Sequence, residues 1–399
     1  MGKPNGQASN GHAGRKLSSW IDAFIKYTDN IESPEIFRRW VAISAIGATL
    51  EQKVWIQTSE PFYPNLYTVL VGHPGGGKTR SIMAARKLLK EIPELHIAPT
   101  SIKMASLVDC LVAAKRIVIN IPHPPLEFNS LILTVDEFGA FMHKFDEELV
   151  DGLTTLYDVT VPYSQQRRTS GLKIKIDNPQ LSIMAGSTPA NLLKFMPEIA
   201  WDQGFTSRII LVYSGERSMS EDVFGKEVAE VPKELIHDLK CIHSLIGPFN
   251  PSDEYRKAIS NWTKLGLPPV PKHPKLTHYC TRRRGHLFKL SMVASVDRGD
   301  DLILTKADFN RAMGWLLDAE AAMPEIFRQG TGSTDAKAMD EIAHFIESRG
   351  TVKERELINF ARERIPVQHV IKVLEIMERS GLIKATAIDP KTGLRLFSS

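Results

Sequence analysis

The chain has 399 residues, of which 43% are hydrophobic and 24% are charged, a balance typical of a globular protein with two or three domains. Its formal net charge of +4 is small, so binding to a polyanion would need local basic clusters. Three cysteines without Cys-x-x-Cys spacing argue against a disulfide framework and a zinc site. No apolar run reaches the roughly 20 residues that span a bilayer, and no signal-peptide pattern is present, so we expect a cytoplasmic protein that does not contact a membrane.

The N-terminal part is predicted to be a tail followed by helices. Residues 1–16 are rich in Gly, Asn and Ser, which favours a disordered tail. Residues 17–58 form a predicted N-terminal helical segment. Apolar residues from Trp20 to about Leu50 recur at spacings of three and four, interrupted by "NIESPE". The pattern predicts two helices, with Ser33 as the cap of the second.

The region from 51 to about 215 alternates short β-branched runs with helical segments. This pattern predicts a parallel sheet covered by helices, and hence an α/β fold. The expected strands lie at 53–58, 66–72, 130–138, 181–187 and 208–214.

The remainder is predicted to be mostly helical and to end in a separate domain. Residues from about 230 to 328 show helical patterns, apart from a Pro-rich loop beginning at Gly266. A polar linker at 329–335 precedes the final segment, 336–399. That segment shows three stretches of helical periodicity, followed by two strands about the turn "DPKTG".

The run "LYTVLVGHPGGGKT" contains the pattern G-x-x-x-x-G-K-[ST] between a buried strand and a helix. In this pattern glycines let backbone N–H groups turn toward phosphates, Lys78 neutralises phosphate charge, and the Thr79 hydroxyl ligates magnesium. The sequence therefore predicts a site for ATP and Mg²⁺. The nucleotide-contacting candidates are Gly72, His73, Pro74, Gly75, Gly76, Gly77, Lys78, Thr79 and Arg80.

An apolar strand that ends in acid, "LILTVDEFG", supplies the expected second half of the site. Asp136 is placed to hold magnesium through water, and Glu137 to polarise the attacking water. Because a kinase would only need to position an acceptor, Glu137 favours an ATP hydrolase.

Two later positions are candidates for the catalytic machinery. Thr188, or Ser187 beside it, would orient the lytic water if its strand neighbours the phosphate-binding strand. Each could instead cap the helix that starts near Pro189. Arg208 precedes an apolar strand, where it could reach the phosphate site of an adjoining subunit or simply lie at the surface.

The order of these motifs resembles the AAA+ ATPases, in the branch of superfamily 3 viral helicases and minichromosome maintenance (MCM) helicases. The resemblance rests on "GHPGGGKT" (Walker A), "LTVDE" (Walker B), "GSTP" (sensor 1) and "TSRIILV" (arginine finger), and it runs from about residue 60 to the C-terminus. It implies an AAA+ P-loop domain with its lid at 59–328, a ring of subunits that is hexameric in these families, and sites shared between subunits. The layout is also similar to P-loop proteins of phages and mobile elements.

The lid resemblance assigns a sensor 2 arginine. Within "YCTRRRGHLFKL", the spacing to a basic-leucine pair makes Arg282 the candidate, with Arg283 and Arg284 as alternatives. Two departures from the MCM pattern are the lack of an N-terminal zinc or OB-fold region, and Ser-Thr in place of the sensor 1 Asn.

A β-hairpin is predicted at 163–177, just before the sensor 1 strand. In the resembled helicases a hairpin at this place grips the DNA backbone in the ring channel. The basic candidates here are Arg167, Arg168, Lys173 and Lys175. The alternative is a hairpin whose charges only face water.

The final segment resembles the C-terminal winged helix of MCM proteins. If its third helix enters a groove of DNA, Gln368, His369 and Lys372 would face the bases, and Lys391 would contact the backbone. Because Glu375 and Glu378 make that helix acidic, a winged helix that docks on protein is an alternative.

Together these features predict an ATP-dependent, ring-forming DNA helicase or translocase, namely a replicative helicase of a phage or mobile element. Its expected partners are single-stranded DNA in the ring channel, further copies of the chain, and a primase or initiator protein. The alternative is an AAA+ helicase loader or initiator that remodels a protein–DNA complex without processive unwinding. A regulatory P-loop switch is a third reading.

Overall fold

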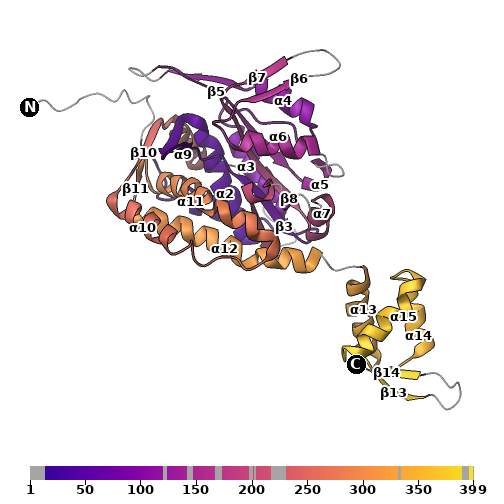
Figure 1. Ribbon diagram of the computed structural model, residues 1–399. Coiled ribbons are helices and arrows are strands. Elements are labelled where there is room, and N and C mark those ends of the chain that lie inside the picture. Colours follow the sequence, from indigo (N-terminus) through magenta and orange to yellow (C-terminus); the bar gives the residue numbers. More distant parts are fainter. Residues whose placement is uncertain are drawn as a thin grey trace, which may run out of the picture. The chain divides into compact units, whose positions relative to one another are not determined.

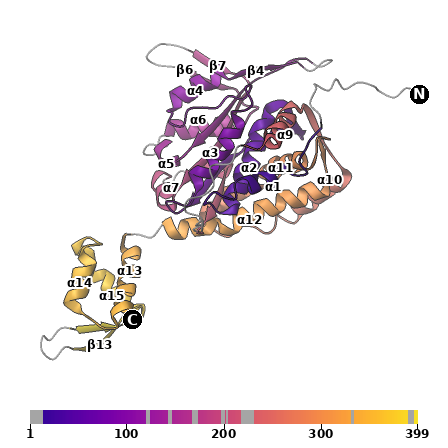
Figure 2. The same ribbon diagram turned by 180° about the vertical axis from the view of Figure 1, so that it is seen from behind.

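The computed structural model describes residues 14–119, 124–141, 147–166, 173–196, 201, 204–216, 231–330, 334–388 and 395–398. The chain divides into two compact units, residues 1–327 and residues 328–399. Figures 1 and 2 show both units from opposite sides. Each unit has its own hydrophobic core.

A five-stranded sheet with the order β4-β5-β8-β3-β9 lies at the centre of the first unit (Figure 1). Its strands are β3 (Tyr67–Gly72), β4 (Lys115–Val118), β5 (Leu126–Val135), β8 (Pro179–Ser187) and β9 (Ile209–Ser214). β5, β8, β3 and β9 run parallel, and β4 pairs antiparallel with β5. The predicted α/β fold is therefore confirmed, and four of the five expected strands lie in this sheet.

The register of the parallel strands places their ends together. Val71 pairs with Ser187 and Gly72 with Ser214, while Val135 pairs with Ala185. The segments that follow β3, β5 and β8 therefore leave the sheet at the same edge. Ligand sites of parallel sheets form at this carboxyl edge.

The strand expected at 53–58 does not join this sheet, so its predicted place was wrong. β1 (Val54–Gln57) belongs to a second sheet with the order β11-β10-β1-β2. Its partners are β2 (Pro61–Phe62) and β10 (Gly247–Pro251), and β11 (Ile303–Leu304) follows β10. β10 and β11 lie in the stretch expected to be helical. A short strand can pair wherever complementary backbone is brought beside it, and local sequence does not specify that partner.

The two predicted N-terminal helices are α1 (Trp20–Tyr27) and α2 (Glu35–Leu50). Every residue of α2 from Trp40 to Leu50 is buried, so this helix is a central part of the core. A Cβ at Gly47 would lie 2.6 Å from the carbonyl oxygen of Pro64, which explains the small residue there. The predicted N-terminal segment 17–58 thus packs into the same unit as the sheet.

Ser33 does not cap α2, contrary to our prediction. The N-cap residue is Pro34, and no side chain caps the helix. The Ser33 hydroxyl instead accepts a hydrogen bond of 2.8 Å from the Ser81 hydroxyl on α3 (Lys78–Leu89). The tertiary contact competes with the local cap for the same oxygen.

Helices pack on the main sheet and also against one another (Figures 1 and 2). α2 and α3 contact β3 and β8, α4 (Met104–Ala113) contacts β5, and α6 (Glu147–Tyr157) contacts β8. The shorter helices α5 and α7 follow β5 and β8. α5 is Phe138–Phe141 and α7 is Pro189–Phe195. Further described helices are α9 (Lys233–Ser244), α10 (Asp253–Lys264), α11 (Thr277–Arg298) and α12 (Lys306–Gly330).

Of the predicted tail, residues 1–13 lie outside the described part of the chain. Arg15 and Lys16 contact Asp238 on α9, through a 3.3 Å ion pair and a 2.9 Å backbone hydrogen bond respectively. Among the described residues, no helix has both the length and the apolar character needed to cross a bilayer.

The second unit contains the three predicted helices and three strands. They are α13 (Thr334–Arg349), β12 (Val352–Lys353), α14 (Glu354–Arg362), α15 (Val367–Arg379), β13 (Lys384–Ile388) and β14 (Arg395–Ser398). The strands form an antiparallel sheet with the order β12-β14-β13. Ile342, Leu357 and Met377, one from each helix, are fully buried in its core.

Candidate nucleotide site

The turn between β3 and α3 has the backbone that its glycines make possible. Gly75 and Gly77 have φ values of 76° and 73°, which favour glycine strongly. Gly77 is the N-cap of α3, and it makes no side-chain hydrogen bond to the N–H groups of the first turn. Those N–H groups and the helix dipole are therefore available to an anion.

The loop before α2 packs directly against this turn. A Cβ at Gly77 would lie only 2.1 Å from the carbonyl oxygen of Glu32 and 2.5 Å from Cβ of Ser33. Arg80 forms a 3.0 Å ion pair with Glu32. The N-terminal segment thus forms one wall of the predicted site, so a side chain at position 77 would push it away.

Lys78 lies folded over the turn. Its Nζ donates hydrogen bonds to the carbonyl oxygens of Gly72 and His73, at 3.0 and 2.7 Å. Burial lowers the pKa of Lys78, and the charge of Glu137 opposes that shift. Its amino group is thus held by neutral carbonyls, which a phosphate would outcompete by charge.

Asp136 and Glu137 follow β5 at the same edge. A Cβ at Gly186 on β8 would lie 2.7 Å from the carbonyl oxygen of Asp136 and 3.4 Å from Cβ of Lys78. Gly186 therefore brings the acidic pair close to the lysine, as a P-loop site requires. Asp136 is exposed, and Glu137 is partly buried.

Glu137 is held by two side chains from the β8–α7 segment. The Ser187 hydroxyl and the Asn191 amide both donate to its Oε1, at 3.2 and 3.4 Å. Thr188 has a different role, since its hydroxyl accepts from the backbone N–H of Asn191 and caps α7. Of the two hydroxyls proposed from the sequence, Ser187 is the one that contacts Glu137. Sequence reasoning missed Asn191, because its place one turn into α7 has no motif.

The oxygen donors present fit the Mg²⁺ that the motif implies. Thr79 and Asp136 are both exposed at this edge and offer a hydroxyl and a carboxylate, which are ligands that Mg²⁺ takes together with water and phosphate. Within the described ranges, no group of three or more His, Cys, Asp or Glu residues could hold a metal. A metal here would therefore depend on the phosphates for further ligands.

Arg208 lies at the opposite end of the sheet, where the parallel strands β3 and β9 begin. It occupies a short turn before β9, whose first residue, Ile209, pairs with Tyr67 at the start of β3. A strand of this length spans about 17–20 Å, so Arg208 is far from the P-loop of its own chain. Its guanidinium does not project outward, since its side chain is 9% exposed. It bonds the carboxylate of Asp158 and, at 2.9 Å, the carbonyl oxygen of Gly204.

The three consecutive arginines of α11 have different environments. Arg282 forms a 3.3 Å ion pair with Asp158 and is partly exposed. Arg283 is fully buried in a paired contact with Glu320, at 2.7 Å for both nitrogen–oxygen pairs. Arg284 is exposed. Because Arg283 is committed to Glu320, it is unsuited to contact a nucleotide.

Lys289 and His286 lie further along α11 in the same region. Lys289 Nζ donates to the backbone carbonyl and side-chain oxygens of Asn65, at 2.9 and 2.5 Å, and lies 4.2 Å from the ring centre of Tyr157. Burial lowers the pKa of Lys289 to about 7 and that of His286 to about 3. Neither position had been given a functional role from the sequence.

The predicted hairpin is present as β6 (Tyr163–Gln166) paired with β7 (Lys173–Ile176). Lys173 and Lys175 are exposed, while the isoleucines that alternate with them are buried. Lys175 forms a 2.5 Å ion pair with Asp177. Arg167 and Arg168 lie outside the described residues, as does Lys391 of the second unit.

The α15 candidates Gln368, His369 and Lys372 are exposed. Val367 and Ile371, at 73% and 57% exposure, lie on the same helix. Its exposed surface is therefore mixed in polarity.

In comparisons with known proteins, no family model matches the chain, and no curated protein matches it significantly.

Proposed function

We propose that the first unit is an ATP-hydrolysing P-loop domain of the AAA+ type. The observation that carries this proposal is the meeting of Lys78, the Asp136–Glu137 pair and the Ser187–Asn191 pair at one edge of a parallel sheet. Each group comes from a different strand end, so the register of the sheet brings them together. The strand order β4-β5-β8-β3-β9 also supports this type, because the lysine strand lies between the Ser187 strand and the Arg208 strand.

In this proposal the chain binds the phosphates of ATP and activates the attacking water. Backbone N–H groups of the first turn of α3 bind the phosphates, and Lys78 turns from its carbonyl partners to the terminal phosphate. Thr79 and Asp136 would hold Mg²⁺, which supplies neutralising charge on the phosphate oxygens when bound. Glu137, fixed through one carboxylate oxygen by Ser187 and Asn191, keeps its second oxygen for the attacking water.

We further propose that copies of the chain assemble into a ring and use hydrolysis to move along single-stranded DNA. Arg208 and Arg282 lie at the end of the sheet away from their own P-loop, which favours a role in the site of an adjoining copy. Arg282 is partly exposed, whereas the buried Arg208 would have to leave Asp158 to take that role. The exposed Lys173 and Lys175 on the β6–β7 hairpin favour contact with the sugar-phosphate backbone. The second unit would be a winged helix.

The test is ATP hydrolysis measured with and without single-stranded DNA. Hydrolysis should rise when DNA is added and should fall by about a hundredfold or more in Glu137→Gln, because general-base contributions are of that order. Glu147→Gln, which changes a carboxylate at the start of α6, is the matched control. Hydrolysis that survives Glu137→Gln would contradict the assignment of the base, and hydrolysis indifferent to DNA would contradict the motor.

The second candidate is an AAA+ loader or initiator that remodels a protein–DNA complex. The exposed Val367 and Ile371 on α15, beside the acidic Glu375, favour a protein partner for the second unit over a DNA groove. DNA-stimulated hydrolysis without strand separation of a tailed duplex would support this candidate.

A further inference from the structure

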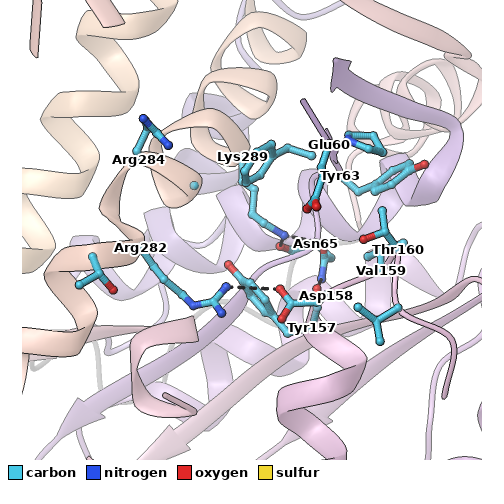
Figure 3. Close-up of a pocket in the computed structure, with 15 residues that line it drawn as sticks. Glu60, Tyr63, Asn65, Tyr157, Asp158, Val159, Thr160, Arg282, Arg284 and Lys289 are labelled. Carbon is cyan, nitrogen blue, oxygen red and sulfur yellow. Dashed lines mark hydrogen bonds and ion pairs between the residues drawn. The ribbon is translucent and has the colours of Figure 1, made fainter. Parts of the chain in front are cut away.

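A pocket of about 530 Å³ lies at the edge of the sheet opposite the P-loop. We call it the Asp158 pocket and define it by Asn65, Tyr157, Asp158, Arg282 and Lys289, which line it together with the loop after α6 and residues 60–63. Figure 3 shows Arg282 and Asp158 pointing toward one another across it.

One carboxylate serves two arginines in this pocket. Asp158 Oδ1 accepts from Arg282, and Oδ2 accepts from Arg208, so the carboxylate bridges the two guanidinium groups. The arginines come from α11 and from the turn before β9, which are far apart in sequence. Asp158 therefore holds both guanidinium groups on one carboxylate, and Gly204 gives Arg208 a second acceptor.

The local charge is positive even with this carboxylate in place. Arg282, Arg284 and Lys289 line the pocket against Asp158 and Glu60. Arg208 is not among the lining residues but adds a further cation through its contact with Asp158, so positive charge is in excess even though burial lowers the pKa of Lys289 to about 7. The buried Nε of Arg208 has no hydrogen-bond partner among the described residues. A half-enclosed site with excess positive charge attracts an anion.

We propose that Asp158 competes with phosphate inside the protein. The Asp158 carboxylate occupies the place between Arg208 and Arg282, and a phosphate group that enters the pocket takes that place. A phosphate group has more oxygens and more charge than a carboxylate, and guanidinium groups bind both bidentately. The entering phosphate therefore displaces Asp158 and takes over both arginines. The hydroxyls of Thr160 and Thr281, which also line the pocket, are further donors.

The phosphate can arrive on the nucleotide of an adjoining copy or on a free small molecule. The first source rests on the proposed function, since it needs shared sites in a ring. The binding chemistry of the pocket is the same for both sources. The competition can therefore be measured without hydrolysis.

The experiment titrates inorganic tripolyphosphate into the full-length chain carrying Lys78→Ala, which weakens the P-loop site, and follows the heat of binding. Adding Asp158→Asn should tighten binding about tenfold, the scale of one charge-assisted hydrogen bond. Adding Asp158→Glu instead, which keeps a carboxylate, should leave the affinity for tripolyphosphate equal to that of the Lys78→Ala chain. Adding Arg282→Ala to Asp158→Asn should remove the gain, which assigns the binding to this pocket.

Unchanged or weaker binding with Asp158→Asn would overturn the proposal. The source of the phosphate is read from sedimentation of Glu137→Gln with ATP. If the phosphate belongs to an adjoining copy, adding Asp158→Asn should lower the subunit concentration needed for assembly about tenfold. Tighter tripolyphosphate binding with unchanged assembly would overturn the intersubunit source and assign the pocket to a free ligand. Absence of ATP hydrolysis would count against the proposed function and leave the titration unaffected.

Discussion

At the residue scale, His286 gives the first unit a defined response to acid. Its ring is fully enclosed, with Nε2 2.9 Å from the carbonyl oxygen of Ser207 and Lys289 one turn along the helix. Burial lowers its folded pKa to about 3, against an ordinary value of 6.5. Between these values the unfolded chain binds a proton that the folded chain does not, so stability is complete above about pH 6.5 and is lost as the pH falls toward 3.

We therefore expect the free energy of unfolding to fall more between pH 7 and pH 5 in the wild type than in His286→Gln. The extra loss should be about 2 kcal/mol if one proton is taken up only on unfolding. Urea unfolding of the first unit at both pH values measures it. His278→Gln, at an exposed position on the same helix, should keep the wild-type loss, and an equal loss in His286→Gln would contradict the prediction.

The residues of the candidate site differ in how far sequence could predict them. Lys78 and Glu137 belong to local patterns that fix both residue type and position. Asn191 and Asp158 were missed, because each acts through a partner that only the fold brings near. The role of Arg208 stays a prediction, and its buried pairing with Asp158, in the loop after α6, could not be read from its own strand.

At the element scale, the contact between the P-loop and the loop before α2 can be tested with two glycines. Gly75 and Gly77 have nearly the same positive φ, yet a Cβ at Gly75 would meet no atom within 4 Å. Gly75→Ala should therefore lower the free energy of unfolding by about 1–2 kcal/mol, the cost of a left-handed backbone alone. Gly77→Ala should lower it further, because its methyl group would also displace Glu32 and Ser33.

Urea unfolding of both variants measures the difference. Gly77→Ala should lower the free energy of unfolding by about 1–3 kcal/mol more than Gly75→Ala does, because the Ser33–Ser81 hydrogen bond is lost and the loop repacks. Equal losses for the two variants would contradict the packing of the N-terminal segment against the P-loop.

Prediction of elements from the sequence was best where the strand is buried on both faces. The runs that became β3, β8 and β9 are buried along their whole length, and such runs signal a parallel sheet without reference to a partner. β1 alternates in burial and is only four residues long, so its pairing with β10 depended on a segment nearly two hundred residues away. The sequence contains no local signal for that pairing.

At the scale of the whole molecule, the proposal of shared sites is supported by the distance between its parts. The P-loop and the two arginines lie at opposite ends of the parallel strands, so a single copy cannot bring them to the same phosphate. In the proposed ring, a complete site combines the P-loop and Glu137 of one copy with Arg208 of another. The two halves can be inactivated separately, which makes the arrangement testable.

Glu137→Gln removes the base and keeps the arginine, while Arg208→Ala removes the arginine and keeps the base. Neither variant alone should hydrolyse ATP well, but a mixture should regain part of the wild-type rate, because some interfaces combine an intact P-loop side with an intact arginine side. The gain should peak near equal proportions of the two variants. A mixture of Glu137→Gln with Lys78→Ala is the matched control, since both changes damage the P-loop side and no interface is complete. Failure of the first mixture to regain activity at any ratio, in variants that still bind nucleotide and assemble, would show that Arg208 does not act in an adjoining site.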